Sequence, residues 1–405
     1  MKIQSIYIEG LHSKREPFSL HFNDDLNIIS GKNGAGKTTI LKLIWYFISG
    51  NLEKALIEVP FKKATLETDV YTLSVIVNDD QDYPYETFFT YKDKTSLSEE
   101  ISNIDVDSIN QHTKHIITKY ISSSYFFPTF RMIEGGFSTE KYDIKHELFQ
   151  HLLINNSQKT PDTIDLVNDF RILSNKLSNK DHRFITSVSS SYINELLISK
   201  YAEIMSLTQP LQAESRLKSQ TFFDGLNNKN DNSISSNALN QLNALQKDLD
   251  SIKEKIDLIK KPLKRFEDSM KFFLKNYEFH FGNKVQFSDN RFESKVRESK
   301  LKTLLGLNLP EKLFDINVLS SGEKQILTLI SYNSFFDDTI FFIDEPENSL
   351  HADWQRILFR ILMKQNPSNQ FIITTHSPFI YSKYPDKELC VHPKFERGNE
   401  KVNHE

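Results

Sequence analysis

Alternating apolar and polar residues near the start of the chain predict short strands, because one face of each strand would be buried and the other solvated. The alternating stretches are residues 2–8, 18–22 and 26–29. Further on, residues 66–77 and 86–91 are rich in β-branched and aromatic side chains, and the polar run 78–82 between them predicts a turn. The pattern therefore predicts a β-rich lobe in the N-terminal part of the chain.

A longer periodicity governs the middle of the chain. The pattern is helical from about residue 141 to residue 222, and the turn-forming run 224–233 predicts the tip of a hairpin or a loop. The chain then returns with a seam of apolar residues at spacings of three and four: Leu239, Leu242, Leu245, Leu249, Ile252, Ile256, Ile259, Leu263, Phe266, Met270 and Phe273. This spacing predicts a left-handed coiled-coil arm of about 50 Å with a kink at Pro262. The facing seam is weaker and meets Pro210; its residues are Leu197, Tyr201, Ile204 and Leu211.

Basic residues on this arm allow two interpretations. The lysines and Arg265 between residues 253 and 265 could form a nucleic-acid face, but they are interleaved with acidic residues, Glu254, Asp257 and Glu267. Mixed charges between apolar positions are typical of a solvated helix face. We therefore expect the arm to be structural.

The aromatic run 120–127 also allows two interpretations. It ends in a proline turn and two glycines, which favours a core strand with its exit loop. The alternative places Arg131 and Glu134 at the nucleotide or at a subunit interface.

Composition narrows the class of protein. The 405 residues suffice for two or more domains, and 50 Lys+Arg against 54 Asp+Glu give a net charge of −4 and no global basic character. Cys390 alone can form neither an internal disulfide nor a cysteine zinc cluster, which suits a reducing cytoplasm. The sequence has no signal-peptide pattern and no apolar run long enough to span a bilayer. We expect a cytoplasmic protein without a membrane partner.

Candidate chemistry begins at residues 31–39, which read G-x-x-x-x-G-K-T followed by a second threonine, between an apolar run and a helical pattern. In such a loop backbone N–H groups close on nucleotide phosphates, the lysine neutralises their oxygens, and the first threonine offers a hydroxyl to Mg²⁺. We therefore expect a nucleoside triphosphate here. The predicted binding residues are Asn33, Gly34, Ala35, Gly36, Lys37, Thr38 and Thr39.

A second anion-binding helix start is predicted at Ser320, Ser321, Gly322 and Glu323, where small hydroxyl residues precede an apolar helical pattern. By itself this pattern is typical of a capping box. Residues 339–343 then predict a buried strand that ends at Asp344 and Glu345, and residues 370–375 predict another that ends at His376. Carboxylates at a strand end can hold Mg²⁺ and activate water, and ligands bind at such strand ends in open α/β sheets.

These four stretches, in this order, resemble the ATP-binding-cassette (ABC) ATPase heads of the SMC, Rad50, RecF and OLD group. The resemblance implies an α/β fold, an ABC-type P-loop ATPase head with a β-rich lobe, formed by residues 1–140 and 277–405, with residues 141–276 as an inserted helical and coiled-coil hairpin. It also implies ATP and Mg²⁺ as cofactors. Lys37 and Thr38 would contact phosphate and Mg²⁺, Asp344 would support Mg²⁺, Glu345 would be the catalytic base and His376 the switch histidine.

In that family, the Walker A loop of one head and the signature loop of a second head hold each nucleotide. Ser320, Ser321 and Gly322 would thus act in trans, which implies a head-to-head dimer at least, and a higher oligomer stays open. Three departures stand out. Residues 347–351 have the E-x-x-L-H form of the OLD-like (AAA15) subset, no glutamine identifies the Q-loop, for which residues 126–131 are the place to look, and the short arm has no zinc hook.

The stretch after His376 is too short for the Toprim nuclease domain of OLD nucleases, so we expect no intrinsic nuclease. Heads of this form resemble the ATPase subunits of bacterial anti-phage systems such as PARIS, Septu and some retrons. That resemblance implies a sensor and scaffold controlling a separate effector protein, a nuclease. The alternative is a RecF-like DNA repair or recombination ATPase that binds duplex, which the near-neutral charge disfavours. A transporter cassette is disfavoured by the arm and by the E-x-x-L-H form.

Overall fold

The computed structural model of the chain describes residues 1–13, 16–78, 85–92, 123–129, 172, 174–185, 190–227, 236–289 and 313–391. Contacts divide the chain into two compact units, residues 1–188 with 336–405 and residues 189–335. The domain boundaries expected from the sequence, after residues 140 and 276, stay predictions. Arg131 and Glu134 lie outside the described residues.

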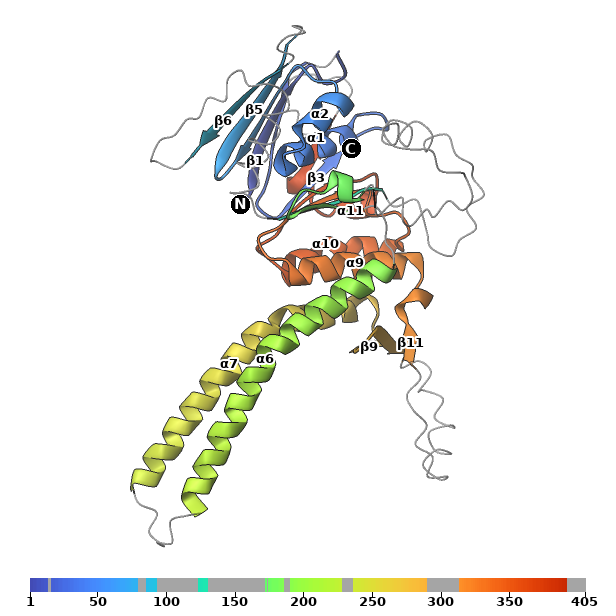
Figure 1. Cartoon of the computed structure of the whole chain (residues 1–405). Coiled ribbons are helices and arrows are strands. Elements are labelled where there is room, and N and C mark those ends of the chain that lie inside the picture. The colour runs from blue at the N-terminus through green and yellow to red at the C-terminus, as the bar shows by residue number, and fades with distance from the viewer. Residues whose placement is uncertain are drawn as a thin grey trace, which may run out of the picture. The chain divides into compact units, whose positions relative to one another are not determined.

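An antiparallel sheet forms the β-rich lobe of the first unit (Figure 1). Its strands, in spatial order, are β2 (Phe18–His21), β1 (Ile3–Glu9), β4 (Lys63–Thr68), β5 (Tyr71–Val77) and β6 (Tyr85–Tyr91). The predicted lobe is confirmed, but residues 66–77 are not continuous. The Thr68 hydroxyl accepts hydrogen bonds from the N–H groups of Val70 and Tyr71, at 3.1 and 2.9 Å, and so closes a turn between β4 and β5.

A parallel sheet built from distant parts of the sequence forms the core of the same unit. Its strands, in spatial order, are β14 (Glu388–Cys390), β3 (Leu26–Ser30), β13 (Gln370–Thr374), β12 (Ile340–Asp344), β7 (Ser124–Phe127) and β8 (His182–Phe184). The aromatic run 120–127 therefore does supply a core strand. The helical prediction for residues 141–222 is wrong at β8, because residues 182–184 pair in parallel with β7.

Helices cover both faces of this core sheet. The helix α1 (Lys37–Ser49) covers one face and α10 (Ala352–Gln365) the other, while α2 (Leu52–Glu58) packs on α1 and the short α11 (Pro378–Tyr381) packs on α10. On one face, Phe126 of β7 meets Trp45 of α1 at 5.3 Å between ring centroids. On the other face, Phe371 of β13 meets Phe359 of α10 at 6.1 Å. Because both faces are buried, the middle positions of the central strands β12 and β13 are apolar, as is typical of parallel sheets, and their polar residues lie at the strand ends.

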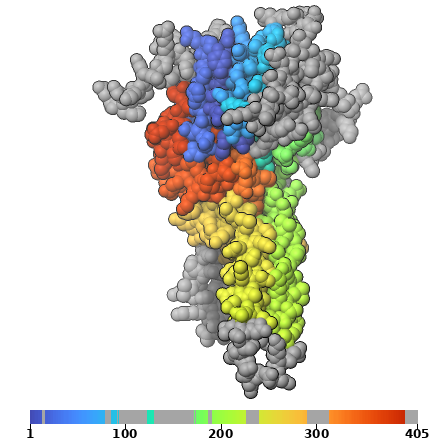
Figure 2. Space-filling view, turned by 90° about the vertical axis from the view of Figure 1, so that its left-hand side faces the viewer, coloured from blue at the N-terminus to red at the C-terminus, as the bar shows by residue number. Residues whose placement is uncertain are grey.

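Two long helices, α6 (Ser190–Asn227) and α7 (Ser236–Phe273), lie side by side in the second unit (Figures 1 and 2). The predicted helical hairpin is confirmed, with Pro210 and Pro262 inside the helices. The predicted seam is buried at Ile252 and Phe266, but Leu242 is 46% exposed. The seam is therefore covered at Ile252 and Phe266, and the prediction fails at Leu242. None of the described helices is both long and apolar enough to cross a membrane.

The base of the arm joins a small antiparallel sheet and one further helix within the second unit. The elements are β9 (Tyr277–Phe281), β10 (Val285–Asp289), β11 (Leu313–Asp315) and α9 (Ser321–Phe335). The strands β9 and β10 pair as an antiparallel hairpin. Phe266 of α7 packs on Phe279 of β9 and on Phe335 of α9, at 5.5 and 6.2 Å between ring centroids. Aromatic contacts therefore tie the arm to α9.

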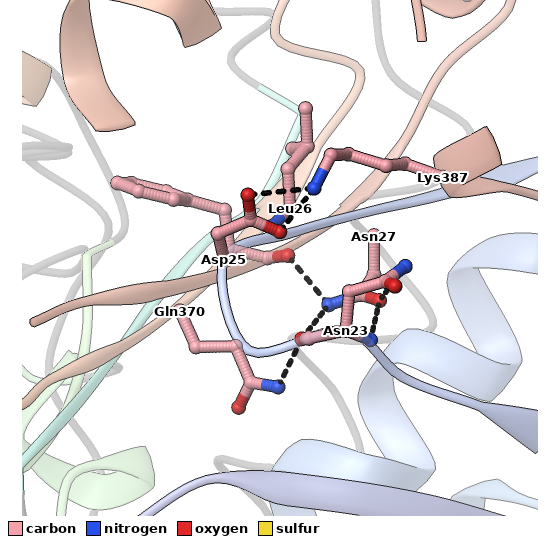
Figure 3. Close-up of polar contacts among 7 residues, drawn as sticks. Asn23, Asp25, Leu26, Asn27, Gln370 and Lys387 are labelled. Carbon is pink, nitrogen blue, oxygen red and sulfur yellow. Dashed lines mark hydrogen bonds and ion pairs between the residues drawn. The ribbon is translucent and has the colours of Figure 1, made fainter. Parts of the chain in front are cut away.

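Polar side chains close the amino edge of the core sheet (Figure 3). Gln370, the first residue of β13, is fully buried. Its amide nitrogen donates to the carbonyl oxygens of Ile3 and Asn23 at 2.9 and 2.8 Å, and its amide oxygen accepts from the Ile3 N–H at 2.9 Å. Asn27 of β3 donates to the same Asn23 carbonyl at 2.9 Å. Amide side chains here replace backbone partners and join β1 to the core sheet.

Candidate nucleotide-binding site

The glycine-rich loop lies between β3 and α1, as the sequence predicts. Gly31 and Gly36 have φ values of 144° and 79°, a backbone region that favours glycine. A Cβ at Gly31 would lie 2.2 Å from the Val391 carbonyl oxygen, so only glycine fits there. In the described part of the chain no side chain caps the start of α1. Its first N–H groups therefore suit an anion. The other predicted binding residues lie in this loop and in the first turn of α1: Asn33, Gly34, Ala35, Lys37, Thr38 and Thr39.

Lys37 connects the glycine loop to the end of β13. Its Nζ lies 3.1 Å from the Gly31 carbonyl oxygen, 3.3 Å from that of Lys32, and 2.7 Å from Nε2 of His376. A neutral imidazole can accept a hydrogen bond from an ammonium group at that nitrogen. Burial lowers the pKa of Lys37 even though nearby carboxylates, Glu345 foremost, act to raise it. The fold thus brings together two predicted site residues that are far apart in the sequence.

Asp344 ends β12 and collects hydroxyl donors from three segments. Oδ1 accepts from the hydroxyl groups of Thr38, at 2.9 Å, and Thr374, and Oδ2 accepts from that of Thr129 at 2.6 Å. Carboxylate and hydroxyl oxygens are the ligands that Mg²⁺ prefers. The residues present therefore fit a magnesium ion held by Asp344 and Thr38.

Thr129 is the residue that the sequence analysis did not single out. It follows β7, which pairs in parallel with β12, so its hydroxyl reaches the carboxylate at the end of β12. It lies within residues 126–131, where a Q-loop contact was expected. In the sequence, Thr129 is recognisable only as a hydroxyl residue just after a buried strand. That pattern points to the Asp344 site only once β7 is known to lie beside β12.

Glu345 adopts a backbone conformation that is rare for a residue with a side chain. Its φ is 50°, and its N–H donates to the Thr374 carbonyl oxygen at 3.0 Å. The Asn348 amide donates to Glu345 Oε2 at 3.1 Å and fixes one carboxylate oxygen. Residues held in such sparsely populated conformations cluster at active sites. The geometry suits a carboxylate that must be oriented for chemistry.

The predicted signature residues, Ser320, Ser321, Gly322 and Glu323, belong to the second unit, at the start of α9. The N–H and hydroxyl groups of Ser320 both donate to Glu323 Oε2 at 2.8 Å, and the Tyr277 hydroxyl donates to Glu323 Oε1 at 3.2 Å. This is a capping box reinforced from β9. The contacts of these residues with a nucleotide stay predictions.

A parallel sheet with a glycine loop, a buried lysine and an aspartate at the adjoining strand ends defines a P-loop ATPase. A family model described as an AAA ATPase domain, AAA_15, matches residues 1–381, so the chain belongs to this family. No curated protein sequence matches the chain.

Solved structures similar to the chain include three SMC head domains. The head from Pyrococcus furiosus, bound to the C-terminal domain of ScpA, is 13% identical with a TM-score of 0.39, over 94% of this chain and 91% of that one. The head from Thermotoga maritima is 10% identical with a TM-score of 0.39, over 95% and 92%. A further SMC head, bound to the C-winged helix domain of ScpA, is 10% identical with a TM-score of 0.43, over 95% and 92%.

Proposed function

We propose that this ATPase binds and hydrolyses ATP with Mg²⁺ at the site formed by the glycine loop and the ends of β12 and β13. The observation that carries the proposal is the convergence of Lys37 with His376, at 2.7 Å, and of Thr38 with Asp344, at 2.9 Å. Bound Mg²⁺ would neutralise charge on the phosphates of ATP, the substrate. A cluster of polar side chains that only stabilised the fold would not require a buried lysine next to a glycine-rich loop.

The roles of the residues follow from their chemistry. Lys37 binds phosphate oxygens, and Thr38 with Asp344 holds the metal. Glu345 accepts the proton of the attacking water at a carboxylate oxygen, and His376 contacts phosphate through its imidazole. Ser320, Ser321 and Gly322 of a second copy complete the site in trans, so the working unit is at least a head-to-head dimer.

Nucleotide-binding measurements on matched lysine variants test the site. Lys37→Ala should abolish ATP binding, whereas Lys32→Ala, which removes an exposed lysine from the same loop, should bind ATP like the wild type. Glu345→Gln should still bind ATP but hydrolyse it at least about 100-fold more slowly, since it loses the proton acceptor. ATP affinity retained in Lys37→Ala would refute the phosphate-site assignment.

At the level of the cell, we propose that the ATPase is a cytoplasmic sensor and scaffold of a bacterial anti-phage system that controls a separate effector protein, a nuclease. Membership of the AAA_15 family, the E-x-x-L-H loop of residues 347–351 and the short arm support this role. A net charge of −4 gives no general attraction to nucleic acid. The proposal is thus for a protein partner in addition to a second copy of the chain.

Purification of a trapped complex tests this role. Tagged Glu345→Gln, expressed from its native locus and purified in ATP and Mg²⁺, should carry a stoichiometric second protein that survives nuclease treatment. The mass of the complex should correspond to two or more copies of the ATPase. Nucleic acid without a second protein, lost at high salt, would instead support the DNA repair or recombination function.

A further inference from the structure

Glu347 lies in the loop that follows β12 and contacts the backbone at the end of β13. Its Oε1 accepts hydrogen bonds from the N–H groups of His376, at 2.6 Å, and Ser377, at 3.1 Å. The side chain of His376 in turn reaches Nζ of Lys37. Glu347 thus contacts the predicted phosphate-binding histidine through that residue's main chain.

Gln355 of α10 makes a second bridge between the same two loops. Its amide nitrogen donates to the carbonyl oxygens of Leu350 and Glu347, at 2.8 and 3.3 Å, and its amide oxygen accepts from the Ser377 hydroxyl at 2.6 Å. Together with the hydrogen bond from the Glu345 N–H to the Thr374 carbonyl, these contacts connect the loop after β12 (residues 345–350) to the loop after β13 (residues 375–377).

The carboxylate of Glu347 is only partly satisfied by these hydrogen bonds. Its second oxygen, Oε2, is buried and has no hydrogen-bond partner among the described residues. Buried polar atoms without a partner are rare in folded proteins, and a catalytic role is one reason for them, which agrees with the place of Glu347 beside the nucleotide site. Several charged groups also lie near one another here. The carboxylates of Glu345, Asp344 and Glu347 all act to raise the pKa of Lys37.

We propose that Glu347 is a positioning residue for ATP hydrolysis, which holds the main chain of His376 in a fixed place relative to Glu345. The hydrogen bonds at Oε1 fix the start of the histidine loop, while Glu345 belongs to the same loop as Glu347. A displacement of residues 345–350 therefore carries His376 with it. This inference rests on the proposed function, because it assigns a supporting residue to that site.

Steady-state kinetics and ATP binding of two variants test the inference. Glu347→Ala should lower kcat at least about tenfold while the Kd for ATP changes less than about twofold, since a misplaced histidine affects turnover more than ground-state binding. Glu347→Gln keeps an acceptor oxygen and should retain kcat within about threefold of the wild type. Glu53→Ala, which removes an exposed glutamate from α2, is the matched control and should leave kcat unchanged.

A double variant shows whether Glu347 acts through His376. In the His376→Ala background, Glu347→Ala should lower kcat by less than about twofold, because the side chain that it positions is already gone. An undiminished effect in that background would overturn the proposal. A Gln variant as slow as the Ala variant would also overturn it, because the charge would then matter more than the hydrogen bonds.

Hydrogen exchange provides a measurement that does not depend on turnover. The amides of His376 and Ser377 should exchange at least about tenfold faster in nucleotide-free Glu347→Ala than in the wild type or in Glu347→Gln. Unchanged exchange would show that the contact does not hold the loop. If the wild type lacked ATPase activity, the proposed function would fail, and the exchange rates would still decide whether Glu347 fixes the histidine loop.

Discussion

Polar side chains lie at both edges of the core parallel sheet, but the two edges differ in how completely these groups are hydrogen-bonded and in backbone strain. At the amino edge, the amide of Gln370 makes one acceptor and two donor hydrogen bonds within the chain, and Asn23 and Asn27 bond to each other. At the carboxyl edge, Glu345 has a positive φ and Glu347 has a buried oxygen without a partner among the described residues. Saturated polar groups serve the fold, whereas strained or unsatisfied ones indicate a site for chemistry.

Among the variants that test this difference between the edges, the largest expected effect is a loss of stability from a substitution at the amino edge. Gln370→Leu should lower the free energy of unfolding by about 3 kcal/mol, because it removes the amide's hydrogen bonds from the buried N–H and C=O groups of Ile3. The carbonyl of Asn23 also loses a donor but keeps its hydrogen bond from Asn27. Urea unfolding measures this change. ATP affinity per folded molecule should not change, since the site lies at the other edge.

An ion pair at the same amino edge provides the control for Gln370→Leu. Lys387 donates to Asp25 Oδ2 at 2.6 Å (Figure 3), but both side chains are partly exposed. Lys387→Ala should therefore cost less than about 1 kcal/mol. Equal costs for the two variants would contradict the view that burial of neutral amides, rather than the number of contacts, secures this edge.

A smaller effect is expected from acid, again at the amino edge. His182 of β8 is buried, its Nδ1 lies 2.7 Å from the Ser124 hydroxyl, and burial lowers the pKa of its imidazole to about 4. The unfolded chain takes up this proton near the ordinary histidine pKa of 6.5, and the folded protein does so only near 4. Stability should thus fall as the pH drops from 6.5 towards 4, by about 2 kcal/mol at pH 5.

Urea unfolding at pH 7 and pH 5 measures this loss. His182→Gln should show a smaller loss between the two pH values than the wild type, whatever its stability at pH 7. His351→Gln removes an exposed histidine and should keep the slope of the wild type. An unchanged slope in His182→Gln would assign the acid sensitivity to other groups.

Sequence patterns identify the carboxyl edge better than the amino edge. Alternation predicts β3, and apolar runs predict β12 and β13; the residues that end or follow these strands are the lysine loop, Asp344 and His376. The ends of parallel strands lie at one edge, so naming the strands places these residues together. The alternating pattern likewise predicts the β-rich lobe, and the heptad spacing predicts the arm.

The contacts that the sequence does not reveal are those that depend on the order of the strands in the sheet. Thr129 reaches Asp344 because β7 lies beside β12, and Gln370 reaches Ile3 because β1 lies at the end of β13. Neither neighbour relation leaves a trace in local periodicity. Residues 182–184 are missed for another reason, since a three-residue strand is too short to show alternation.

The smallest effect tests whether Thr129 belongs to the chemistry of the carboxyl edge. Thr129→Val keeps the shape of the side chain but removes the hydrogen bond to Asp344 Oδ2, 2.6 Å long. Losing one hydrogen bond to a carboxylate that orients the metal should lower the ATPase rate about five- to tenfold and raise the Mg²⁺ concentration needed for half-maximal rate. Thr129→Ser should restore both values. If Thr129→Val hydrolysed ATP at the wild-type rate with the wild-type Mg²⁺ midpoint, Thr129 would resemble the amino-edge amides, a polar group that serves the fold.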